Sequence, residues 1–429
     1  LVLHGPEPRA VGSSFGLGAA KVPIGREDDP PPAVVLDDPS ASRHHAVVVR
    51  TTDHRSFEIH DLGSRNGTFV NGMQIESTPL SHGDIVRIGD HVMLFERLSM
   101  QDCELLIEAR DPSSSWRGES VPARRIANSL VSLAPLADPV LVIGESGAGK
   151  ERIAQELHRL SKRKGELVPV NCAAIPEALA EAELFGHAAG AFTGAPGARS
   201  GLFAAAEHGT LFLDEIGELP VPLQAKLLRA LATGEIRRVG ETKTRLVDVR
   251  VVAATHVDLA EAVTRGAFRG DLYSRLAAFE IQVPALRERR DDILGLGREL
   301  VGLRTPQLSP DAAEALVTYR WPYNVRELLQ SLRRCLHASG GERVELDHLP
   351  EPIANALPPR GAPNPEAPAV LPATLRIPRD VVPSADDLRA VLEQFDGNVV
   401  RVAAFFGKDR RQIYRWAERL GVDLTSFRS

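Results

Sequence analysis

Cysteines, long apolar runs and an excess of positive charge are all scarce in this sequence. Three of the 429 residues are cysteines, Cys103, Cys172 and Cys335, and their odd number and wide spacing argue against a disulfide framework and a cysteine-rich zinc site. Nowhere do about 18 consecutive apolar residues occur, and the first residues lack the basic start and apolar run of a signal peptide. We therefore expect neither secretion nor a membrane span, and a reducing cytoplasm is the simplest location.

The composition is that of a globular protein, since 43% of the residues are hydrophobic and 25% are charged. The formal net charge is −6, so any contact with nucleic acid must be local rather than a property of the whole chain. At roughly 100 to 200 residues per domain, the length predicts about three domains.

Sequence patterns divide the chain into several domains. Residues 1–100 contain short apolar stretches such as KVPIG between turn residues, which predicts a β-sandwich. After a linker at 101–120, apolar strands alternate with helical stretches over 121–350, which predicts an α/β fold with a parallel sheet. Residues 351–383 hold nine prolines and predict a semi-rigid linker, and 384–429 carry three short amphipathic helical patterns.

A phosphate-binding loop is indicated by GESGAGK, which follows the apolar strand PVLVIG and precedes a helical stretch. Backbone N–H groups of such a glycine-rich turn wrap phosphate oxygens, and Lys150 reaches the outer phosphates. The alternative is a glycine turn with a purely structural role. The expected nucleotide contacts are Gly144, Glu145, Ser146, Gly147, Ala148, Gly149, Lys150 and Glu151.

Two acids at the end of the apolar strand TLFLDE strengthen the nucleotide interpretation. Asp214 stands where Mg²⁺ needs a carboxylate, and Glu215 stands where an attacking water needs a base. The alternative is an acidic end on a buried strand. The sequence thus predicts an ATPase that uses ATP and Mg²⁺.

The central region resembles the AAA+ domain of bacterial enhancer-binding activators, which act on the sigma-54 form of RNA polymerase. The resemblance rests on GESGAGKE, ELFGH, GAFTGA, TLFLDEIGELP, LQAKLLRAL, RRVG, LRERRDDI and WPYNVREL, which occur in the family's order and at fitting spacing. It implies a P-loop ATPase at 121–350 with a helical lid at about 288–350, assembled as a hexameric ring. In this family Glu151 is the usual residue after the loop lysine.

The segment GAFTGA has no visible phosphate, metal or core role, and the resemblance implies one. The family projects a hairpin-like loop with this segment from the ring, and that loop touches the sigma factor. Glycines let the tip bend sharply, while Phe192 offers an apolar contact and Thr193 a hydroxyl. The alternative is a glycine-rich surface loop with one buried Phe. The expected contacts are Gly190, Ala191, Phe192, Thr193, Gly194 and Ala195.

Further catalytic roles are implied by position in the family pattern. Asn171 matches an asparagine that restrains the catalytic glutamate. Arg269 and Arg275 match the pair from which the family draws arginine fingers that act on a neighbour's nucleotide. Arg326 matches a lid arginine that senses the outer phosphates. The chain departs from the pattern at His256, where asparagine is usual, and this departure puts sensing of the γ-phosphate there in doubt.

The N-terminal region resembles a forkhead-associated (FHA) domain, a module that binds phosphothreonine peptides. IGR at 24–26, SRHH at 42–45 and SRNGTFVNG at 64–72 carry the resemblance. Their cationic and hydroxyl side chains suit a phosphate, and an asparagine amide can hold the peptide backbone. The pattern makes His45 structural, two adjacent histidines are a weak metal signal, and a sandwich without phosphate binding stays an alternative. The expected peptide contacts are Arg26, Ser42, Arg43, Ser64, Arg65 and Asn66.

The C-terminal segment 384–429 resembles the all-α Fis-type helix-turn-helix that follows this ATPase in the family. From Asn398 to Leu420 it carries six basic residues against two acidic ones, in a chain that is acidic overall. Such charges suit DNA phosphates, although the pattern alone also fits a solvated basic helix. Trp416 is expected to pack rather than to enter the major groove. The expected DNA contacts are Arg410, Arg411 and Arg415.

These resemblances together predict a transcriptional activator that holds upstream enhancer DNA and remodels sigma-54 RNA polymerase. An FHA domain in place of a receiver domain predicts gating by a phosphothreonine-containing protein, the product of a Ser/Thr kinase. Two other classes stay open: an AAA+ unfoldase, and a phosphothreonine-binding scaffold with a silent ATPase. GAFTGA and the terminal helices argue against the unfoldase, and Lys150, Asp214 and Glu215 argue against silence.

Overall fold

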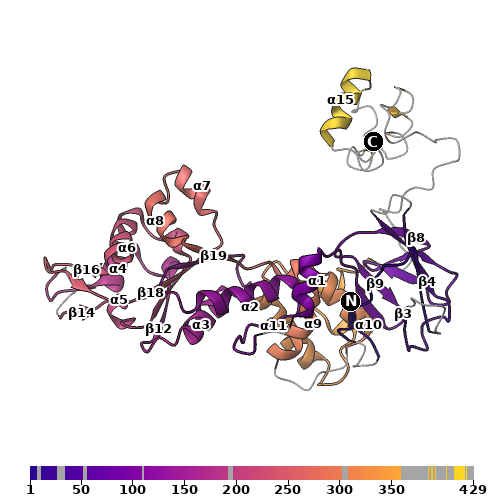
Figure 1. The fold of residues 1–429 in the computed structure, drawn as a ribbon, viewed down its shortest axis with the longest axis horizontal. Coiled ribbons are helices and arrows are strands. Elements are labelled where there is room, and N and C mark those ends of the chain that lie inside the picture. The colour runs from indigo at the N-terminus through magenta and orange to yellow at the C-terminus, as the bar shows by residue number, and fades with distance from the viewer. Residues whose placement is uncertain are drawn as a thin grey trace. The chain divides into compact units, whose positions relative to one another are not determined.

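The chain forms two compact units, Leu1–Ala362 and Pro363–Ser429. The first unit holds a β-sandwich, an α/β domain and a helical lid, drawn as ribbons in Figure 1. The computed structural model describes residues 1–6, 11–26, 34–51, 56–108, 111–191, 197–301 and 308–358, and then 385, 388, 389, 392, 402, 410–420 and 422.

The N-terminal part is a sandwich of two five-stranded sheets, so the predicted β-sandwich is confirmed. The sheet orders are β3-β2-β4-β5-β8 and β1-β10-β9-β6-β7. Side chains alternate along the strands, and one set, which includes Ile24, Ile59 and Ile88, fills the space between the sheets. The strands are β1 (Val2–His4), β2 (Lys21–Gly25), β3 (Val34–Val35), β4 (Ala46–Arg50), β5 (Phe57–Asp61), β6 (Thr68–Val70), β7 (Met73–Ile75), β8 (Ser77–Leu80), β9 (Ile85–Ile88) and β10 (His91–Leu94).

The central domain is built on a parallel sheet of order β12-β15-β18-β11-β19, which confirms the predicted α/β fold. Its strands are nearly continuous apolar runs because both faces of the sheet are covered; Leu141 joins one core cluster while Val140 and Val142 join another. The carboxyl ends of the strands share one edge, where strand-end side chains meet. The strands are β11 (Val140–Ile143), β12 (Leu167–Asn171), β15 (Thr210–Asp214), β18 (Arg250–Thr255) and β19 (Phe279–Gln282).

Helices and two small hairpins surround this sheet. The hairpins are β13 (Gly186–His187) with β14 (Arg199–Ser200), and β16 (Glu235–Ile236) with β17 (Arg245–Leu246). The helices are α1 (Met100–Ile107), α2 (Val121–Leu133), α3 (Lys150–Ser161), α4 (Glu177–Phe185), α5 (Leu202–Ala205), α6 (Val221–Thr233), α7 (Leu259–Thr264) and α8 (Gly270–Leu276), with short 3₁₀ turns η1 (Cys172–Ala174), η2 (Ile216–Glu218) and η3 (Leu286–Glu288). Among the described residues, no helix has both the length and the apolar character that crossing a membrane requires.

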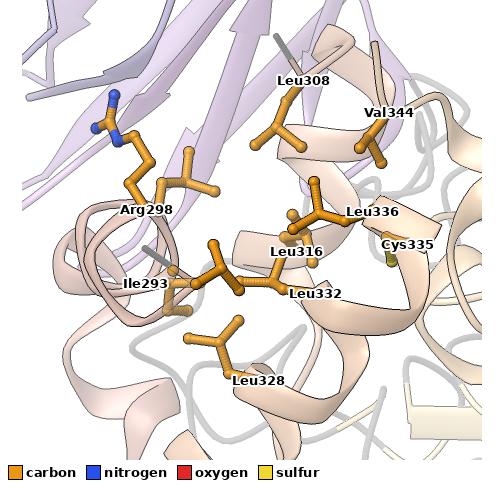
Figure 2. A pocket seen from close by; sticks show the side chains of 12 residues that line it. Ile293, Arg298, Leu308, Leu316, Leu328, Leu332, Cys335, Leu336 and Val344 are labelled. Atoms are coloured by element: carbon orange, nitrogen blue, oxygen red, sulfur yellow. The ribbon is translucent and has the colours of Figure 1, made fainter. Parts of the chain in front are cut away.

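The lid consists of α9 (Arg290–Leu300), α10 (Pro310–Thr318), α11 (Asn324–Ala338), the 3₁₀ turn η4 (Leu346–His348) and α12 (Glu351–Ala354). Figure 2 shows apolar side chains of α9, α10 and α11, such as Ile293, Leu316 and Leu332, converging on a cavity of about 30 Å³. A space of that size admits a water or two, so it is a gap in the core rather than a ligand site.

Two boundaries expected from the sequence lie elsewhere in the structure. The expected proline-rich linker at 351–383 starts later, because α12 packs on the lid and Ile353 is buried in its core. The expected linker at 101–120 begins as helix α1 and is held in place further on: the Ser115 hydroxyl donates to Glu156 of α3. Burial of a few apolar and hydroxyl side chains therefore extends the folded part past both predicted limits.

The sheet β1-β10-β9-β6-β7 buries both of its faces. Along β9 and β10, Val86 and Met93 point into the sandwich, whereas Ile85, Val92 and Leu94 belong to the lid core. Helix α10 contacts both strands, as Figure 1 shows for α10 and β9. The outer side of this sheet is therefore a lid-docking face, made of Leu3, Ile85, Arg87, Val92 and Leu94.

A buried ion pair joins this face to the lid. The Arg87 guanidinium donates to Glu314 of α10 at 2.6 Å, and the Gly72 N–H donates to the other carboxylate oxygen at 3.0 Å. The Glu314 side chain is only 1% exposed, and Arg87 also lies 4.0 Å from the ring centre of Phe69. Burial raises the pKa of Glu314, whereas the charge of Arg87 lowers it.

In the second unit, the described residues include helix α15 (Arg410–Leu420) and a small apolar core. Trp416 is buried in that core with Leu388, Ile413 and Val422, which confirms the expectation that it packs. The other helices of the expected helix-turn-helix lie largely outside the described residues.

Candidate functional site

The loop Gly144–Lys150 joins β11 to α3 in the geometry of a phosphate cradle. Gly147 and Gly149 have φ of +74° and +113°, a left-handed backbone that favours glycine. A Cβ on Gly147 would also collide with the carbonyl oxygen of Tyr323. Lys150 is 7% exposed, and its Nζ donates to the carbonyl oxygens of Gly144 and Glu145. The loop lysine is thus held above the turn that would receive phosphates.

Asp214 and Glu215 end strand β15 beside this loop. Nζ of Lys150 lies 3.6 Å from Oε1 of Glu215, and the N–H of Glu215 donates to Asp214. Burial and the charge of Glu215 raise the pKa of Asp214, whereas the charge of Lys150 lowers it. Glu215 has φ +52°, uncommon for a residue with a side chain and frequent at functional sites.

His256 lies against Glu215, a contact that the sequence did not reveal. Its Nδ1 is 2.6 Å from Oε2 of Glu215. Asn171, expected to restrain Glu215, lies at the end of the neighbouring strand in register with Asp214. Its Oδ1 accepts the N–H of Ala173 and caps the turn η1.

Several lid residues bind the phosphate loop through hydrogen bonds. The sequence did not predict them as site residues. Arg287 makes two hydrogen bonds to the Glu145 carboxylate, at 2.9 and 2.6 Å, and these bonds hold the pKa of Glu145 at about 2. Arg289 is buried and donates to the carbonyl of Ala148. The fully buried Asn324 donates to both Glu145 and the carbonyl of Ser146. In the sequence, these hydrogen bonds were indicated only by the motifs LRERRDDI and WPYNVREL, which contain the three residues.

Arg326, expected to sense the outer phosphates, lies beside the same loop, and its sensing role stays a prediction. The N–H of the preceding residue, Val325, donates to the carbonyl of Gly147 at 3.1 Å. A Cβ on Gly147 would lie 3.1 Å from Cβ of Arg326. The start of α11 is therefore seated directly on the phosphate loop.

The two candidate arginine fingers contact their own domain. Arg269 forms an exposed ion pair with Asp271, and the Arg275 guanidinium donates to the carbonyl of Leu231. Both side chains are exposed on and before α8, so both are accessible to another subunit. Their action on a neighbour's nucleotide stays a prediction.

The hairpin β13–β14 forms the base of the GAFTGA loop. Gly186 pairs with Ser200 and His187 with Arg199, so the chain leaves and returns at one place. Gly190 has φ +74°, and Ala191 is also described. The remaining expected contacts lie outside the described residues: Phe192, Thr193, Gly194 and Ala195.

The sandwich loops that carry the expected peptide contacts are braced by His45. It is fully buried; its Nδ1 accepts the N–H of Ser42 and its Nε2 bonds the carbonyl of Gly67, so its expected structural role is confirmed. Ser42 Oγ accepts the N–H of Arg65. The Ser64 hydroxyl donates to Asp61, which makes it a loop brace as well.

Three loops thereby bring the expected peptide contacts together. Asn66 donates to the carbonyl of Ser40, and the N–H of Arg26 donates to the carbonyl of Ser42. The Arg26, Arg43 and Arg65 side chains are exposed. Exposed arginine side chains on loops that contact one another suit a phosphorylated ligand.

Of the expected DNA contacts, Arg415 is exposed on α15; the Arg410 and Arg411 side chains lie outside the described ones.

Within the described part of the chain, no group of three or more His, Cys, Asp or Glu residues could hold a metal. Mg²⁺ differs, because it is usually bound by one or two carboxylates together with substrate phosphates. Asp214 beside the phosphate loop fits that requirement.

Comparison with known proteins places these features in a family. Residues 22–89 match the FHA domain, 117–282 the sigma-54 interaction domain, and 287–365 the AAA+ ATPase lid domain. NtrX from Brucella abortus, solved in complex with ADP, is 31% identical with a TM-score of 0.53, over 75% of this chain and 71% of that one.

Two curated relatives extend the match. The nitric oxide reductase transcription regulator NorR2 of Cupriavidus necator is 47% identical over an alignment of 324 residues, and the match covers 69% of this chain and 61% of that protein. The anaerobic nitric oxide reductase transcription regulator NorR of Aeromonas hydrophila is 40% identical over an alignment of 361 residues, and the match covers 78% of this chain and 69% of that protein. This chain thus belongs to the sigma-54-dependent transcription activators.

Proposed function

We propose that this chain is an ATP-hydrolysing activator of sigma-54 RNA polymerase, gated through its FHA domain. The observation that carries the proposal is the meeting of Lys150, Asp214 and Glu215 at the carboxyl edge of one sheet. The same domain carries GAFTGA on the hairpin β13–β14. The NtrX structures in complex with ADP and with ATP, at TM-scores of 0.53 and 0.50, support nucleotide binding by this chain.

The site residues divide the chemistry of hydrolysis among them. The Gly144–Lys150 loop binds the phosphates through backbone N–H groups, and Lys150 exchanges its carbonyl and Glu215 contacts for the outer phosphates. Mg²⁺, held by Asp214, would offset phosphate charge when bound. Glu215 orients the attacking water and takes its proton. Arg269 or Arg275 of another subunit completes the site, so this mechanism requires neighbouring subunits, as in a closed ring.

A continuous set of contacts supports gating by the FHA domain. Arg287 and Arg289 bind the phosphate loop, and the next residue, Arg290, donates to the carbonyl of Gly83 in the β8–β9 turn of the sandwich at 2.8 Å. A shift of the lid-docking face would therefore move the segment that holds the phosphate loop. Binding of a phosphothreonine protein at Arg26, on the same sandwich, is the input that we propose.

Upstream DNA binding is proposed for the second unit. Arg415 is exposed on α15, and the neighbouring sequence is rich in arginine. Backbone phosphates of DNA suit such charges.

The test measures ATP turnover and open-complex formation with one preparation of the full chain, sigma-54 polymerase and promoter DNA. Glu215→Gln should bind ATP but lose turnover by about 10²-fold or more, since an amide accepts no proton. Thr193→Ala should hydrolyse ATP normally yet fail to open the promoter. Glu218→Gln and Thr264→Ala, exposed residues on the same domain, are matched controls that should keep both activities. Normal turnover by Glu215→Gln, or normal opening by Thr193→Ala, would contradict the proposal.

A further inference from the structure

The end of strand β18 places His256 next to the general base. β18 and β15 are parallel neighbours, so His256 and Glu215 both emerge at the carboxyl edge. The backbone before His256 is fixed, because the carbonyl of Thr255 accepts the N–H of Gly144 and its hydroxyl oxygen accepts the N–H of Val257. The imidazole therefore extends from a rigid strand end attached to the phosphate loop.

Each carboxylate oxygen of Glu215 has a different cationic or polar neighbour. Oε2 lies 2.6 Å from Nδ1 of His256, and Oε1 lies 3.6 Å from Nζ of Lys150. Phosphates compete for the charge of Lys150, so its contact with Glu215 weakens when nucleotide binds. His256 then remains as the partner that can keep the carboxylate in one orientation. Among the described residues, no hydrogen bond joins Asn171 to Glu215; the oxygen of the Asn171 side chain accepts the N–H of Ala173.

We propose that His256 is a positioning residue that orients Glu215 toward the attacking water, a role that rests on the ATPase function proposed above. The left-handed backbone of Glu215 fixes where its side chain begins, but the torsions of that side chain can still swing the carboxylate. A Nδ1–H donor on Oε2 removes this freedom and leaves Oε1 to accept the proton. Small errors in the placement of a reacting group cost large factors in rate, about 10²-fold for 1 Å.

Side-chain geometry provides a graded set of variants. The amide nitrogen of asparagine is separated from Cβ by the same number of bonds as Nδ1 of histidine, so His256→Asn keeps a donor at this place. In glutamine the nitrogen lies one bond further, and alanine has no donor. We therefore expect kcat within about threefold of the parent for His256→Asn, and a loss of about 10- to 100-fold for His256→Gln and His256→Ala. KM for ATP and the affinity for a non-hydrolysable ATP analogue should change by less than about twofold.

The experiment is steady-state ATP hydrolysis by the full chain, with analogue binding measured on the same samples. His208→Asn is the matched control, since His208 is exposed and pairs with Asp248 at 3.2 Å outside the site; it should behave as the parent. In a Glu215→Gln background, His256→Ala should cause no further loss, because the group it orients has already been changed. His256 is half exposed, so its variants should fold, and melting temperatures would verify this.

The outcomes separate this inference from the proposed function. If the parent hydrolyses ATP and Glu215→Gln does not, but His256→Ala keeps the parent's kcat, the positioning role is wrong and the ATPase function stands. If His256→Ala lowers kcat and the affinity for the analogue together, and the loss of affinity persists in the Glu215→Gln background, His256 belongs to nucleotide binding and the inference is overturned. A parent without turnover would overturn the proposed function itself.

Discussion

The buried ion pair between Arg87 and Glu314 provides a quantitative test of how the sandwich is attached to the lid. Arg87→Met removes the cation but keeps much of the side-chain volume, and it leaves the 1% exposed Glu314 with the N–H of Gly72. Breaking a buried pair in this way typically costs about 3 to 5 kcal/mol. Glu314 can limit the cost by taking up a proton: from its ordinary pKa of 4.5, protonation at pH 7 costs about 3.4 kcal/mol. We therefore expect a loss of about 3 kcal/mol.

The pH dependence of this loss follows from the sign of the pKa shift. Burial raises the pKa of Glu314, so the folded state binds the proton of this carboxyl more tightly than the unfolded chain does. The protonated carboxyl therefore contributes fully to stability below its ordinary pKa, and this contribution is lost as the pH rises through the folded-state pKa. Removal of Arg87 raises the pKa further. The difference between variant and parent should thus be largest near neutral pH and shrink as the pH falls toward 4.5.

Hydrogen exchange of the full chain measures the change, because the protection of amides in β9, β10 and α10 reports local opening. Arg87→Met/Glu314→Leu should recover most of the loss, since a buried ion pair can be replaced by apolar groups at little cost. Arg199→Met, which breaks an exposed ion pair with Glu183 of similar length, should change stability by less than about 0.5 kcal/mol. The reasoning would be refuted if the stability of Arg87→Met lay within about 0.5 kcal/mol of the parent's, or if the double variant were no more stable than the single one.

Three further predictions concern other parts of the first unit. Arg26→Ala should abolish binding of phosphothreonine peptides to the full chain, as measured by calorimetry, and equal affinity would indicate a sandwich without phosphate binding. Arg275→Ala should lower ATP turnover by about 10³-fold, and mixing it with Glu215→Gln should restore part of the turnover if the arginine acts on a neighbour's site; no rescue would contradict that. Burial and neighbouring acids raise the pKa of Asp291 to about 8, so the unfolding free energy should fall between pH 6 and 8 by up to about 1.4 kcal/mol per pH unit, and Asp291→Asn should flatten this slope in urea unfolding.

The phosphate loop and the two acids could be predicted from the sequence because their chemistry is local. Lys150 lies at a fixed offset from its glycines, and Asp214 and Glu215 directly end an apolar strand. The sandwich and the parallel sheet followed from alternation and from apolar runs, which are also local patterns.

Contacts between distant segments could not be predicted in the same way. Arg287 and Glu145 are 142 residues apart, and no periodicity connects them. His256 and Glu215 could have been paired by asking which strands are neighbours in the sheet, but strand order is not visible in a single sequence. The lid-docking face is only weakly indicated by the sequence. The run DIVRIGDHVMLFE is more apolar than strands with one solvated face, and this composition is expected when both faces of a sheet are buried.

The doubly buried sheet has a consequence for work with fragments of this protein. Cutting the chain after the sandwich would expose Leu3, Ile85, Val92 and Leu94 on the outer side of the sheet, and the lid would lose its contacts with these residues. Exposed apolar strands of this kind invite self-association. A shortened protein with altered ATP turnover would therefore report a damaged lid as well as a missing regulator. Point substitutions at the lid-docking face keep the sandwich on the lid, so they test the regulatory role of the sandwich more directly than truncation does.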